Sequence, residues 1–237
     1  MRVLVDRLPG GPGGSGESEV DGQRLRMLYA PPRLPWLRVN MVTTLDGAAT
    51  GGGGRSGDIN SAADKRGFDT LRSLADAVVV GAGTARTEGY HPTDVPLVLV
   101  SRRGEVPEQL CDAAPGDVWM VTCAASPGLS GCRDVLGAEH VVVCGDDTVD
   151  LVAMRAGLVD RGFASLLGEG GPRLLADLLA AGVVDELCVS LVPLLVGGPH
   201  PRITSGGALG ITGRLALLLE EDGTLLGRWF TSPPPLR

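Results

Sequence analysis

Two glycine clusters in the 237-residue chain have the position and composition of phosphate-binding turns. Gly81-Ala82-Gly83-Thr84 and Gly168-Glu169-Gly170-Gly171-Pro172 each follow a short apolar run. Glycine permits a close approach to the backbone, and the free N–H groups at the start of a helix attract anions. Each cluster alone is more typical of an ordinary turn, and neither matches a G-x-G-x-x-G fingerprint or a P-loop. Two such turns on successive units of one sheet favour a dinucleotide that lies across the strand ends.

A serine and two arginines follow a third apolar run. Ser101, Arg102 and Arg103 come directly after residues 97–100. Folds specific for NAD usually place a carboxylate at such a strand end, whereas serine and arginine suit a 2′-phosphate. The alternative is a pair of solvated arginines in a loop. Together with the two glycine turns, this element favours NADPH over NADH.

Alternating strands and helices are required to bring these turns to one edge of a sheet. Apolar runs predict strands at residues 37–42, 77–80, 97–100, 118–121, 141–144, 166–167 and 185–192. Helices are predicted over 61–74, 150–161 and 172–181, and residues 215–219 and 224–230 predict a hairpin around Asp222-Gly223. We therefore expect an α/β fold with a mixed, mostly parallel sheet flanked by helices, and with a C-terminal antiparallel β-hairpin.

The regular pattern begins at Trp36, which sets the expected domain boundary. Residues 9–16 are almost all Gly, Pro and Ser, as in a flexible segment. We therefore expect residues 1–35 to form an N-terminal extension with a flexible Gly/Pro segment. Residues 36–237 are expected to form a single NADPH-binding domain.

Composition argues against several classes of partner and site. The net charge of −7, without a basic stripe, argues against nucleic acid and anionic membranes. The five cysteines are widely spaced and form no C-x-x-C pair, so we expect buried thiols and no metal site. No apolar run reaches the roughly 18 residues of a membrane span, and the N-terminus lacks a signal-peptide pattern. These features predict a cytoplasmic protein.

Several segments together resemble the reductase domain of bacterial riboflavin biosynthesis, a pyrimidine reductase family with a dihydrofolate-reductase-like fold. The resemblance covers roughly residues 36–230. It is carried by residues 40–47 (NMVTTLDG), 80–84 (VGAGT), Ser101-Arg102, 168–172 (GEGGP), 182–187 (GVVDEL), Pro193 and Gly197-Gly198.

The resemblance implies a cofactor, a substrate pocket and an assembly. NADPH is expected along the sheet, and in the family the hydride reduces the ring-opened ribosyl group of an aminouracil phosphate to a ribityl chain. Asp46 and Glu169 are the expected catalytic carboxylates, although alone they are typical of an Asp-Gly turn and a helix N-terminus. A homodimer is expected. The implied substrate-binding residues are Asn40, Thr44, Asp46, Glu88 and Glu169, and the implied cofactor-binding residues are Gly81, Gly83, Thr84, Ser101, Arg102, Gly168, Gly170, Gly171 and Pro172.

The chain departs from the family pattern after the first glycine turn. Glu88 can replace one of two paired aspartates, but Val95 stands where the family has an arginine suited to the substrate phosphate. The zinc-ligand signature of the companion deaminase domain is also missing from the sequence. Two alternatives therefore stay open: a reductase of dihydrofolate or another pterin on the same fold, and a non-catalytic nucleotide-binding homologue. The cations that could replace the arginine are Lys65, Arg66 and Arg86.

Overall fold

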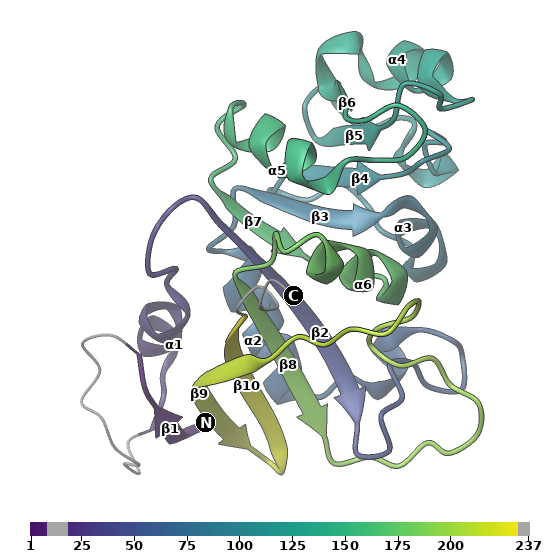
Figure 1. Ribbon diagram of the computed structural model, residues 1–237. Coiled ribbons are helices and arrows are strands. Elements are labelled where there is room, and N and C mark those ends of the chain that lie inside the picture. The colour runs from purple at the N-terminus through teal and green to yellow at the C-terminus, as the bar shows by residue number, and fades with distance from the viewer. Residues whose placement is uncertain (9–18, 232–237) are drawn as a thin grey trace.

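The computed structural model describes residues 1–8 and 19–231, and the predicted flexible segment at residues 9–16 lies outside them. A sheet of ten strands forms the centre of the molecule, in the order β1-β9-β10-β8-β2-β7-β3-β4-β5-β6 (Figure 1). The strands are β1 (Arg2–Asp6), β2 (Trp36–Thr44), β3 (Ala77–Gly81), β4 (Leu97–Val100), β5 (Val118–Thr122), β6 (Val141–Val143), β7 (Ser165–Gly168), β8 (Glu186–Val192), β9 (Gly213–Glu221) and β10 (Thr224–Thr231). The helices are α1 (Gly22–Tyr29), α2 (Ala62–Arg72), α3 (Ala82–Glu88), α4 (Leu129–Leu136), α5 (Leu151–Val159) and α6 (Pro172–Ala180), with 3-10 turns at Ser56–Ile59, Glu108–Leu110 and Ala138–His140.

The strand directions confirm the predicted fold class. The strands from β8 through β2, β7, β3, β4 and β5 to β6 are parallel to their neighbours, whereas β10, β9 and β1 add on antiparallel. The predicted hairpin is β9–β10, and both turn residues, Asp222 and Gly223, have positive φ (51° and 78°). That conformation matches the twist of a two-residue hairpin.

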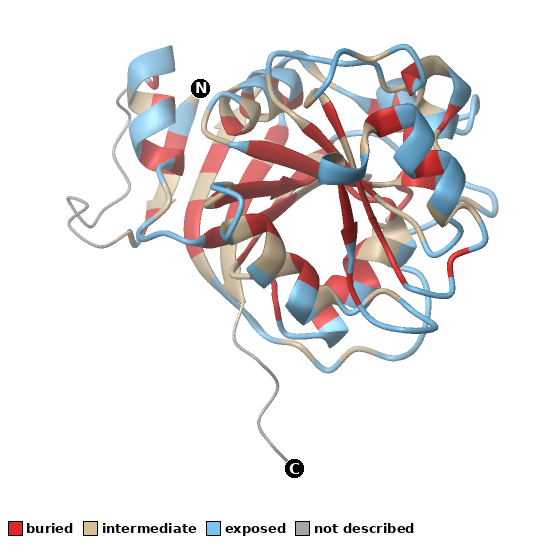
Figure 2. Ribbon diagram, turned by 90° about the horizontal axis from the view of Figure 1, so that it is seen from above, coloured by how far each residue is buried: buried red, intermediate tan, exposed pale blue. Residues whose placement is uncertain are grey.

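Each face of the sheet is covered by its own set of helices. Along β3, Val78 and Val80 pack in one core cluster, whereas Ala77 and Val79 pack in the other. The first cluster includes side chains of α1, α2, α3 and α4, and the second includes those of α5 and α6. Successive side chains of a strand point to opposite faces of the sheet. A continuous run of apolar residues in one strand therefore contributes to both core clusters. The buried strands lie between helices whose outer sides are exposed (Figure 2).

Local signals positioned the predicted helices correctly. Ser61 caps α2, since its side chain accepts a hydrogen bond from the N–H of Asp64. Asp150 caps α5 in the same way. Pro172 is the first residue of α6, and Gly182 follows its end with a positive φ of 67°. Capping residues and a first-turn proline are therefore enough to place these helices.

The N-terminal segment contains two elements that the sequence analysis did not predict. Strand β1 pairs with β9, and α1 packs against α2 with Leu25 and Tyr29 fully buried. Buried arginines hold the end of α1: Arg38 donates to the carbonyl of Tyr29, and Arg228 donates to those of Leu28 and Ala30. The described residues of this segment thus share the sheet and the core of the following chain.

One feature of the sheet creates space for a site. Strand β2 pairs with β7 only from Trp36 to Val39, because β7 ends at Gly168. It continues along β8 as far as Thr44. The edge of β2 beyond Val39 therefore faces a crevice, and crevices at the carboxyl ends of parallel strands are the usual ligand sites of α/β sheets.

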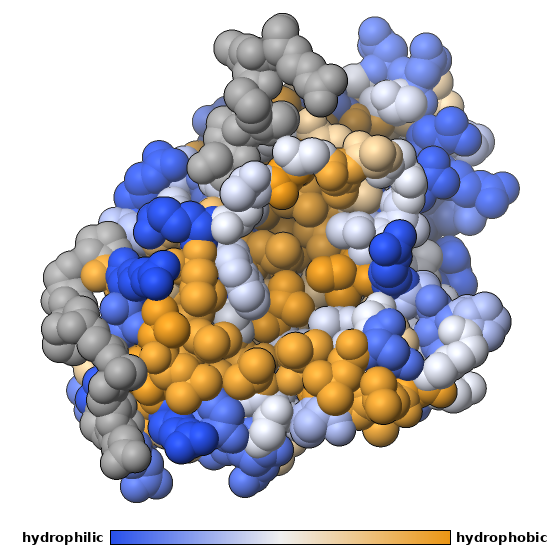
Figure 3. Space-filling model, turned by 60° about the horizontal axis from the view of Figure 1, so that its bottom comes forward, coloured by the Kyte–Doolittle hydropathy of each residue, from blue (hydrophilic) through white to orange (hydrophobic). Residues whose placement is uncertain are grey.

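Apolar side chains gather around a hollow on another face of the molecule (Figure 3). An apolar cavity of about 400 Å³ lies between α6, β8, β10 and the segment before β9. Its lining offers no titratable group: Leu179, Leu187, Val189, Leu209, Ile211, Gly213, Trp229 and Thr231. Among the described residues, no helix has the length and apolar character needed to cross a membrane.

Candidate active site

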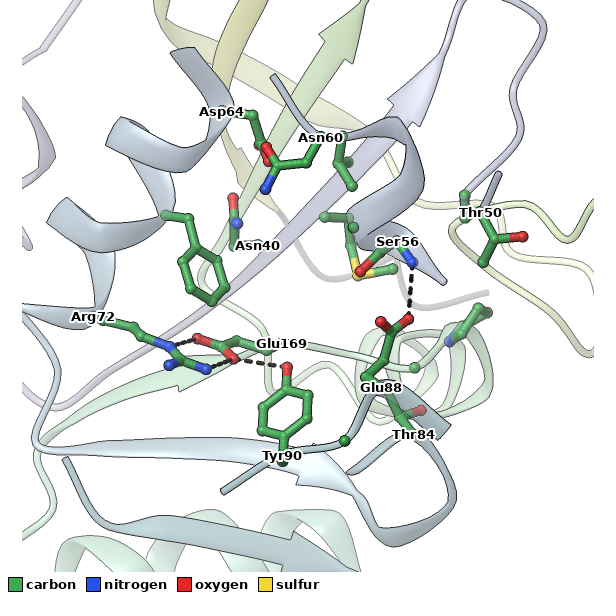
Figure 4. Close-up of a pocket in the computed structure, with 18 of the residues that line it drawn as sticks. Asn40, Thr50, Ser56, Asn60, Asp64, Arg72, Thr84, Glu88, Tyr90 and Glu169 are labelled. Atoms are coloured by element: carbon green, nitrogen blue, oxygen red, sulfur yellow. Dashed lines mark hydrogen bonds and ion pairs between the residues drawn. The ribbon is translucent and has the colours of Figure 1, made fainter. Parts of the chain in front are cut away.

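A cavity of about 390 Å³ fills the crevice beside β2 (Figure 4). Helix α2 forms one wall, and the wall opposite consists of the end of α3 with the segment that follows it. Residues 169–172, between β7 and α6, close the inner end. The lining residues that carry polar side chains are Asn40, Thr50, Ser56, Asn60, Asp64, Arg72, Thr84, Glu88, Tyr90, His91, Thr93 and Glu169.

Glu169 is the centre of an ion-pair network at one end of the cavity. Its backbone N–H continues the ladder with β3 by donating to the carbonyl of Val79, so its side chain points to the face covered by α2. Arg72 donates from Nε and Nη2 to the two carboxylate oxygens, at 2.7 Å each. The Tyr90 hydroxyl donates to Oε2 at 2.8 Å. Burial raises the pKa of Tyr90, and the charge of Glu169 raises it further, so the phenol remains a donor.

Helix α2 places a phenylalanine beside this network. The Arg72 guanidinium stacks on the Phe68 ring, 4.4 Å from its centroid, and also lies 5.7 Å from that of Tyr90. Burial alone would lower the pKa of Arg72, but its hydrogen bonds and charge pairing with Glu169 raise it overall. The arginine therefore stays cationic while it is held on both sides.

Asp64 lies at the other end of the cavity from this network, near Asn60 and Asn40 (Figure 4). Its side chain is buried, and its Oδ1 has no hydrogen-bond partner among the described residues. Burial raises the pKa of this carboxyl, and a hydrogen bond from Ser190 on β8 offsets part of the shift. This end of the cavity wall thus contains a buried carboxyl with one unpartnered oxygen.

Glu88 joins the cavity wall to the glycine loop that follows β2. Its Oε1 accepts a hydrogen bond from the backbone N–H of Ser56 at 3.0 Å. The loop itself is held by Asp58, whose carboxylate accepts from the N–H groups of Gly53 and Arg55. The loop at residues 51–58 is therefore attached to the end of α3.

Two predicted substrate residues lie outside the cavity lining. Thr44 is the last residue of β2, and its hydroxyl donates to the carboxylate of Asp46. The carboxylate of Asp46 also accepts from the backbone N–H groups of Val196 and Gly197 at 3.1 and 2.6 Å. These bonds lower its pKa, with the Thr44 hydroxyl as the largest cause. The geometry gives Asp46 a role in joining two loops, and its catalytic role stays a prediction.

The two predicted phosphate turns meet at one edge of the sheet. The N–H of Gly81 donates to the carbonyl of Gly170 at 2.9 Å. A Cβ on Gly171 would lie 2.2 Å from Oγ1 of Thr84, so the two turns touch only because this residue is glycine. At Gly83 a Cβ would meet no atom within 4 Å, so the space there is open.

The glycines of the second turn are required for different reasons. A Cβ on Gly168 would lie 2.9 Å from Val39, so close strand packing demands glycine there. Gly170 has a positive φ of 94° and precedes a cis peptide bond to Gly171. Pro172 and Gly171 line the cavity, whereas Gly168 is buried in the sheet.

The chemistry of this edge fits the phosphates of a dinucleotide. Among the described residues, no side chain caps the N-terminus of α6, so its first-turn N–H groups remain available to an anion. Thr84 lines the cavity next to this helix end. Open space at Gly83 and free donors at α6 are what a phosphate group requires.

Ser101 and Arg102 extend this edge to the next strand. Val100, the last residue of β4, is the register partner of Gly81 on β3. The Ser101 hydroxyl accepts hydrogen bonds from the backbone of Arg103 and Gly104, which fixes the turn. Within the described chain, Arg102 is exposed and has no ion-pair partner, whereas Arg103 pairs with Glu105 at 3.4 Å. Arg102 is thus the arginine free to bind an anion.

None of the three cations considered as substitutes for the missing arginine lines the cavity. Lys65 pairs with Asp69, and Arg66 pairs with Glu221. Arg86 lies on the exposed side of α3. Among the described residues, the arginine and histidine side chains that do line the cavity are Arg72 and His91.

Sequence reasoning missed the part of the site on α2. Asp64, Phe68 and Arg72 are spaced four residues apart, so they share one face of the helix. Two charged residues on a face that also carries a phenylalanine are the signal that could have revealed them. Tyr90 gave no local signal, because its partner Glu169 is distant in the sequence.

Comparison with known proteins supports the resemblance seen in the sequence. The family model described as the RibD C-terminal domain matches residues 35–221. A 2,5-diamino-6-ribosylamino-4(3H)-pyrimidinone 5′-phosphate reductase of Methanothermobacter thermautotrophicus is 31% identical over 189 residues, which cover 73% of this chain and 84% of the relative. The corresponding reductase of Archaeoglobus fulgidus is 28% identical, over 73% of this chain and 87% of its own. The crystal structure of a pyrimidine reductase-like protein from Corynebacterium diphtheriae shares the fold, with a TM-score of 0.73, 23% identity and coverage of 84% and 92%.

Proposed function

Because the chain belongs to the RibD C-terminal domain family, we propose that it is an NADPH-dependent reductase of a ribosylaminopyrimidine. The observation that carries this proposal is the position of the cavity. It lies beside β2 and adjoins both the α6 N-terminus and the Gly83-Thr84 turn. A dinucleotide whose pyrophosphate binds at these turns would have its nicotinamide ring in the polar cavity.

The residues along the sheet edge would hold the cofactor. The first-turn N–H groups of α6 and the hydroxyl of Thr84 would bind the pyrophosphate, and Gly83 leaves it space. Ser101 and Arg102 would bind the 2′-phosphate, which distinguishes NADPH from NADH. When bound, NADPH supplies the hydride that reduces the ring-opened ribosyl group.

The cavity residues would position the substrate and exclude water. Glu169 holds Arg72 and Tyr90 in fixed orientations, and Phe68 and Met41 provide apolar surface beside them. Hydride transfer to a carbon–nitrogen double bond needs no nucleophile from the protein; it needs positioning and a dry site. The loop tied to Glu88 lies where a cover over the reacting groups is needed.

A pterin reductase is the second candidate function. The cavity is lined by Asp64, Glu88 and Glu169, whereas its one arginine is already paired. This balance suits an uncharged, donor-rich ring better than a phosphate ester. The relatives named above support the ribosylaminopyrimidine reductase. The excess of carboxylates over free cations in the cavity supports the pterin reductase.

A direct assay separates the candidates. The purified chain is incubated with NADPH and either the ribosylaminopyrimidine phosphate or dihydrofolate, and NADPH consumption is followed by absorbance. The proposal expects turnover of the pyrimidine and not of dihydrofolate. Turnover of dihydrofolate alone supports the second candidate, and tight NADPH binding without any turnover supports a non-catalytic nucleotide-binding protein.

The assembly and location of the protein are also proposals. The resemblance to the family supports a homodimer, and the apolar face of Figure 3 offers surface that a second copy could cover. Light scattering on the purified chain tests this, since a monomer mass contradicts it. A cytoplasmic location is supported by the reducing environment that five free cysteines suit.

A further inference from the structure

The segment that joins β8 to β9 is long and has no regular structure. Residues 193–212 form neither a helix nor a strand. Glycine and proline, which disfavour both, stand at positions 193, 197–199, 201, 206, 207 and 210. We call residues 201–212 the strap, and Figure 1 shows this part passing α6 before it reaches β9. Without a helix or strand of its own, the strap depends on tertiary contacts for its position.

Two backbone hydrogen bonds attach the strap to the wall of the active-site cavity. The carbonyl of Pro201 accepts from the N–H of Ala49 at 2.7 Å. The N–H of Ser205 donates to the carbonyl of Pro172 at 3.1 Å. Ala49 and Pro172 both line the cavity. The strap is therefore bonded to two separate parts of the site, although its own residues lie outside the cavity lining.

The second of these bonds reaches the helix end that would hold the cofactor phosphates. Pro172 is the first residue of α6, and its carbonyl is the acceptor, so the bond leaves the first-turn N–H groups unoccupied. The strap stays close to the helix after this point. A Cβ on Gly206 would lie 3.9 Å from that of Ala176, one turn further along α6. The strap thus supports the start of α6 and does not compete for its donors.

Apolar side chains anchor the other half of the strap. Leu209 and Ile211 line the apolar cavity of Figure 3, together with Leu179 near the end of α6 and Leu187 on β8. Both strap residues are half-buried and pack against the second core cluster, which includes the apolar side of α6. The strap is therefore attached to α6 twice: by a hydrogen bond at the first turn and by apolar packing at the last.

We propose that Leu209 is a positioning residue for the cofactor. It anchors the strap in the apolar cavity, and the strap, through the N–H of Ser205, holds the first turn of α6 in the orientation that binds the pyrophosphate. This inference rests on the proposed function, because the cofactor is part of it. A few N–H groups at a helix end bind a phosphate only when they point at it, so a looser first turn weakens binding. NADPH and NADH share the pyrophosphate, and both should be affected by the same factor.

Two variants loosen the strap at its two attachments, and each has a matched control. Leu209→Ala shortens the apolar anchor, whereas Leu187→Ala removes the same side chain from the β8 wall of the same cavity. Ser205→Pro removes the N–H that donates to Pro172, whereas Ser205→Ala keeps it. Calorimetry should show the Kd values for NADPH and NADH raised equally, by about 3- to 30-fold, in the two strap variants and unchanged in the controls. A merely structural role would lower the melting temperature of both leucine variants without separating their cofactor affinities.

Amide hydrogen exchange of α6 tests the strap without any cofactor. Exchange in the first two turns, followed by mass spectrometry, should be faster in Leu209→Ala and Ser205→Pro than in their controls. Unchanged exchange, equal cofactor affinity of Leu209→Ala and Leu187→Ala, or a loss confined to NADPH overturns the positioning role. Faster exchange in a chain whose wild type binds neither cofactor contradicts the proposed function alone. If thermal unfolding shows that Ser205→Pro is not folded, the two leucine variants decide the question.

Discussion

Arg72 and Glu169 form a bidentate ion pair between the last turn of α2 and the end of β7, with two N–O distances of 2.7 Å. The Glu169 side chain is 2% exposed and that of Arg72 is 25% exposed. The pair therefore fixes the wall of the cavity and neutralises a buried carboxylate at the same time. Tyr90 donates to the same carboxylate, so Glu169 fixes the positions of both Arg72 and Tyr90.

Removing the arginine should cost stability. Arg72→Met leaves the buried carboxylate of Glu169 without its cation, and we expect a loss of roughly 1–3 kcal/mol, below the range for fully buried pairs because Arg72 is partly exposed. Urea unfolding measures it. The double variant Arg72→Met with Glu169→Gln should recover part of the loss. A double variant as unstable as the sum of both single variants would contradict the coupling.

Arg102 should decide between the two nicotinamide cofactors. Arg102→Ala is expected to weaken NADPH binding about 10- to 100-fold, because a charged hydrogen bond to the 2′-phosphate contributes about 1.5–3 kcal/mol. NADH binding should be nearly unchanged, as calorimetry can show. Arg103→Ala is the matched control, since Arg103 is engaged with Glu105. An equal loss of affinity for NADPH and NADH in Arg102→Ala would contradict the assignment of Arg102 to the 2′-phosphate.

A side chain at Gly83 should block the cofactor without disturbing the fold. Gly83 lies in α3, and a Cβ there meets no atom within 4 Å, so Gly83→Val adds bulk only where the phosphate is expected. Gly131→Val, in the open space of α4, is the control for valine in a helix. Calorimetry should show lost NADPH binding in the first variant only. Gly170 is unsuitable for this test, because its positive φ of 94° makes any substitution strained.

The stability of the ligand-free protein should report on Asp64. Because its pKa is raised in the fold, Asp64 contributes stability below its unfolded pKa, and this contribution is lost as the pH rises through the folded pKa. Asp64→Asn should therefore gain melting temperature relative to wild type as the pH rises above about 4, the usual pKa of an unfolded aspartate. The exposed Asp69→Asn should show no such gain. A difference between Asp64→Asn and wild type that stays constant with pH would contradict the raised pKa.

Substrate phosphate should contribute little to binding. The cations expected from sequence, Lys65, Arg66 and Arg86, do not line the cavity, and Arg72 is paired. We expect KM values for the phosphorylated and dephosphorylated pyrimidine to differ by less than about tenfold, which is smaller than the effect of one charged hydrogen bond. A KM that rises a hundredfold or more without the phosphate would show that His91 or Arg72 serves as its anchor.

The fold was predictable where the signals are local. Apolar runs located the central strands, and Ser61, Asp150 and Pro172 located three helices. Strand β1 and helix α1 were missed because both are short and depend on distant partners such as Arg228. Their stability comes from tertiary packing, which composition does not reveal.

The site was predictable only in part, for the same reason. The glycine turns follow strands directly, so the sequence shows them. Arg72 and Glu169 are 97 residues apart, and no local pattern pairs them. For Asp46 the local signal was incomplete. The Asp46-Gly47 pair suggested an ordinary turn, whereas in the structure the carboxylate also accepts hydrogen bonds from a second loop, at Val196 and Gly197.

The central claim is that this chain reduces a ribosylaminopyrimidine with NADPH. The most direct measurement is the rate of NADPH consumption when the purified chain meets 2,5-diamino-6-ribosylamino-4(3H)-pyrimidinone 5′-phosphate, with product formation checked by mass spectrometry. The account predicts consumption that depends on the pyrimidine, yields a product heavier by two hydrogens, and disappears in Gly83→Val. No consumption by a wild-type chain that binds NADPH tightly would contradict it.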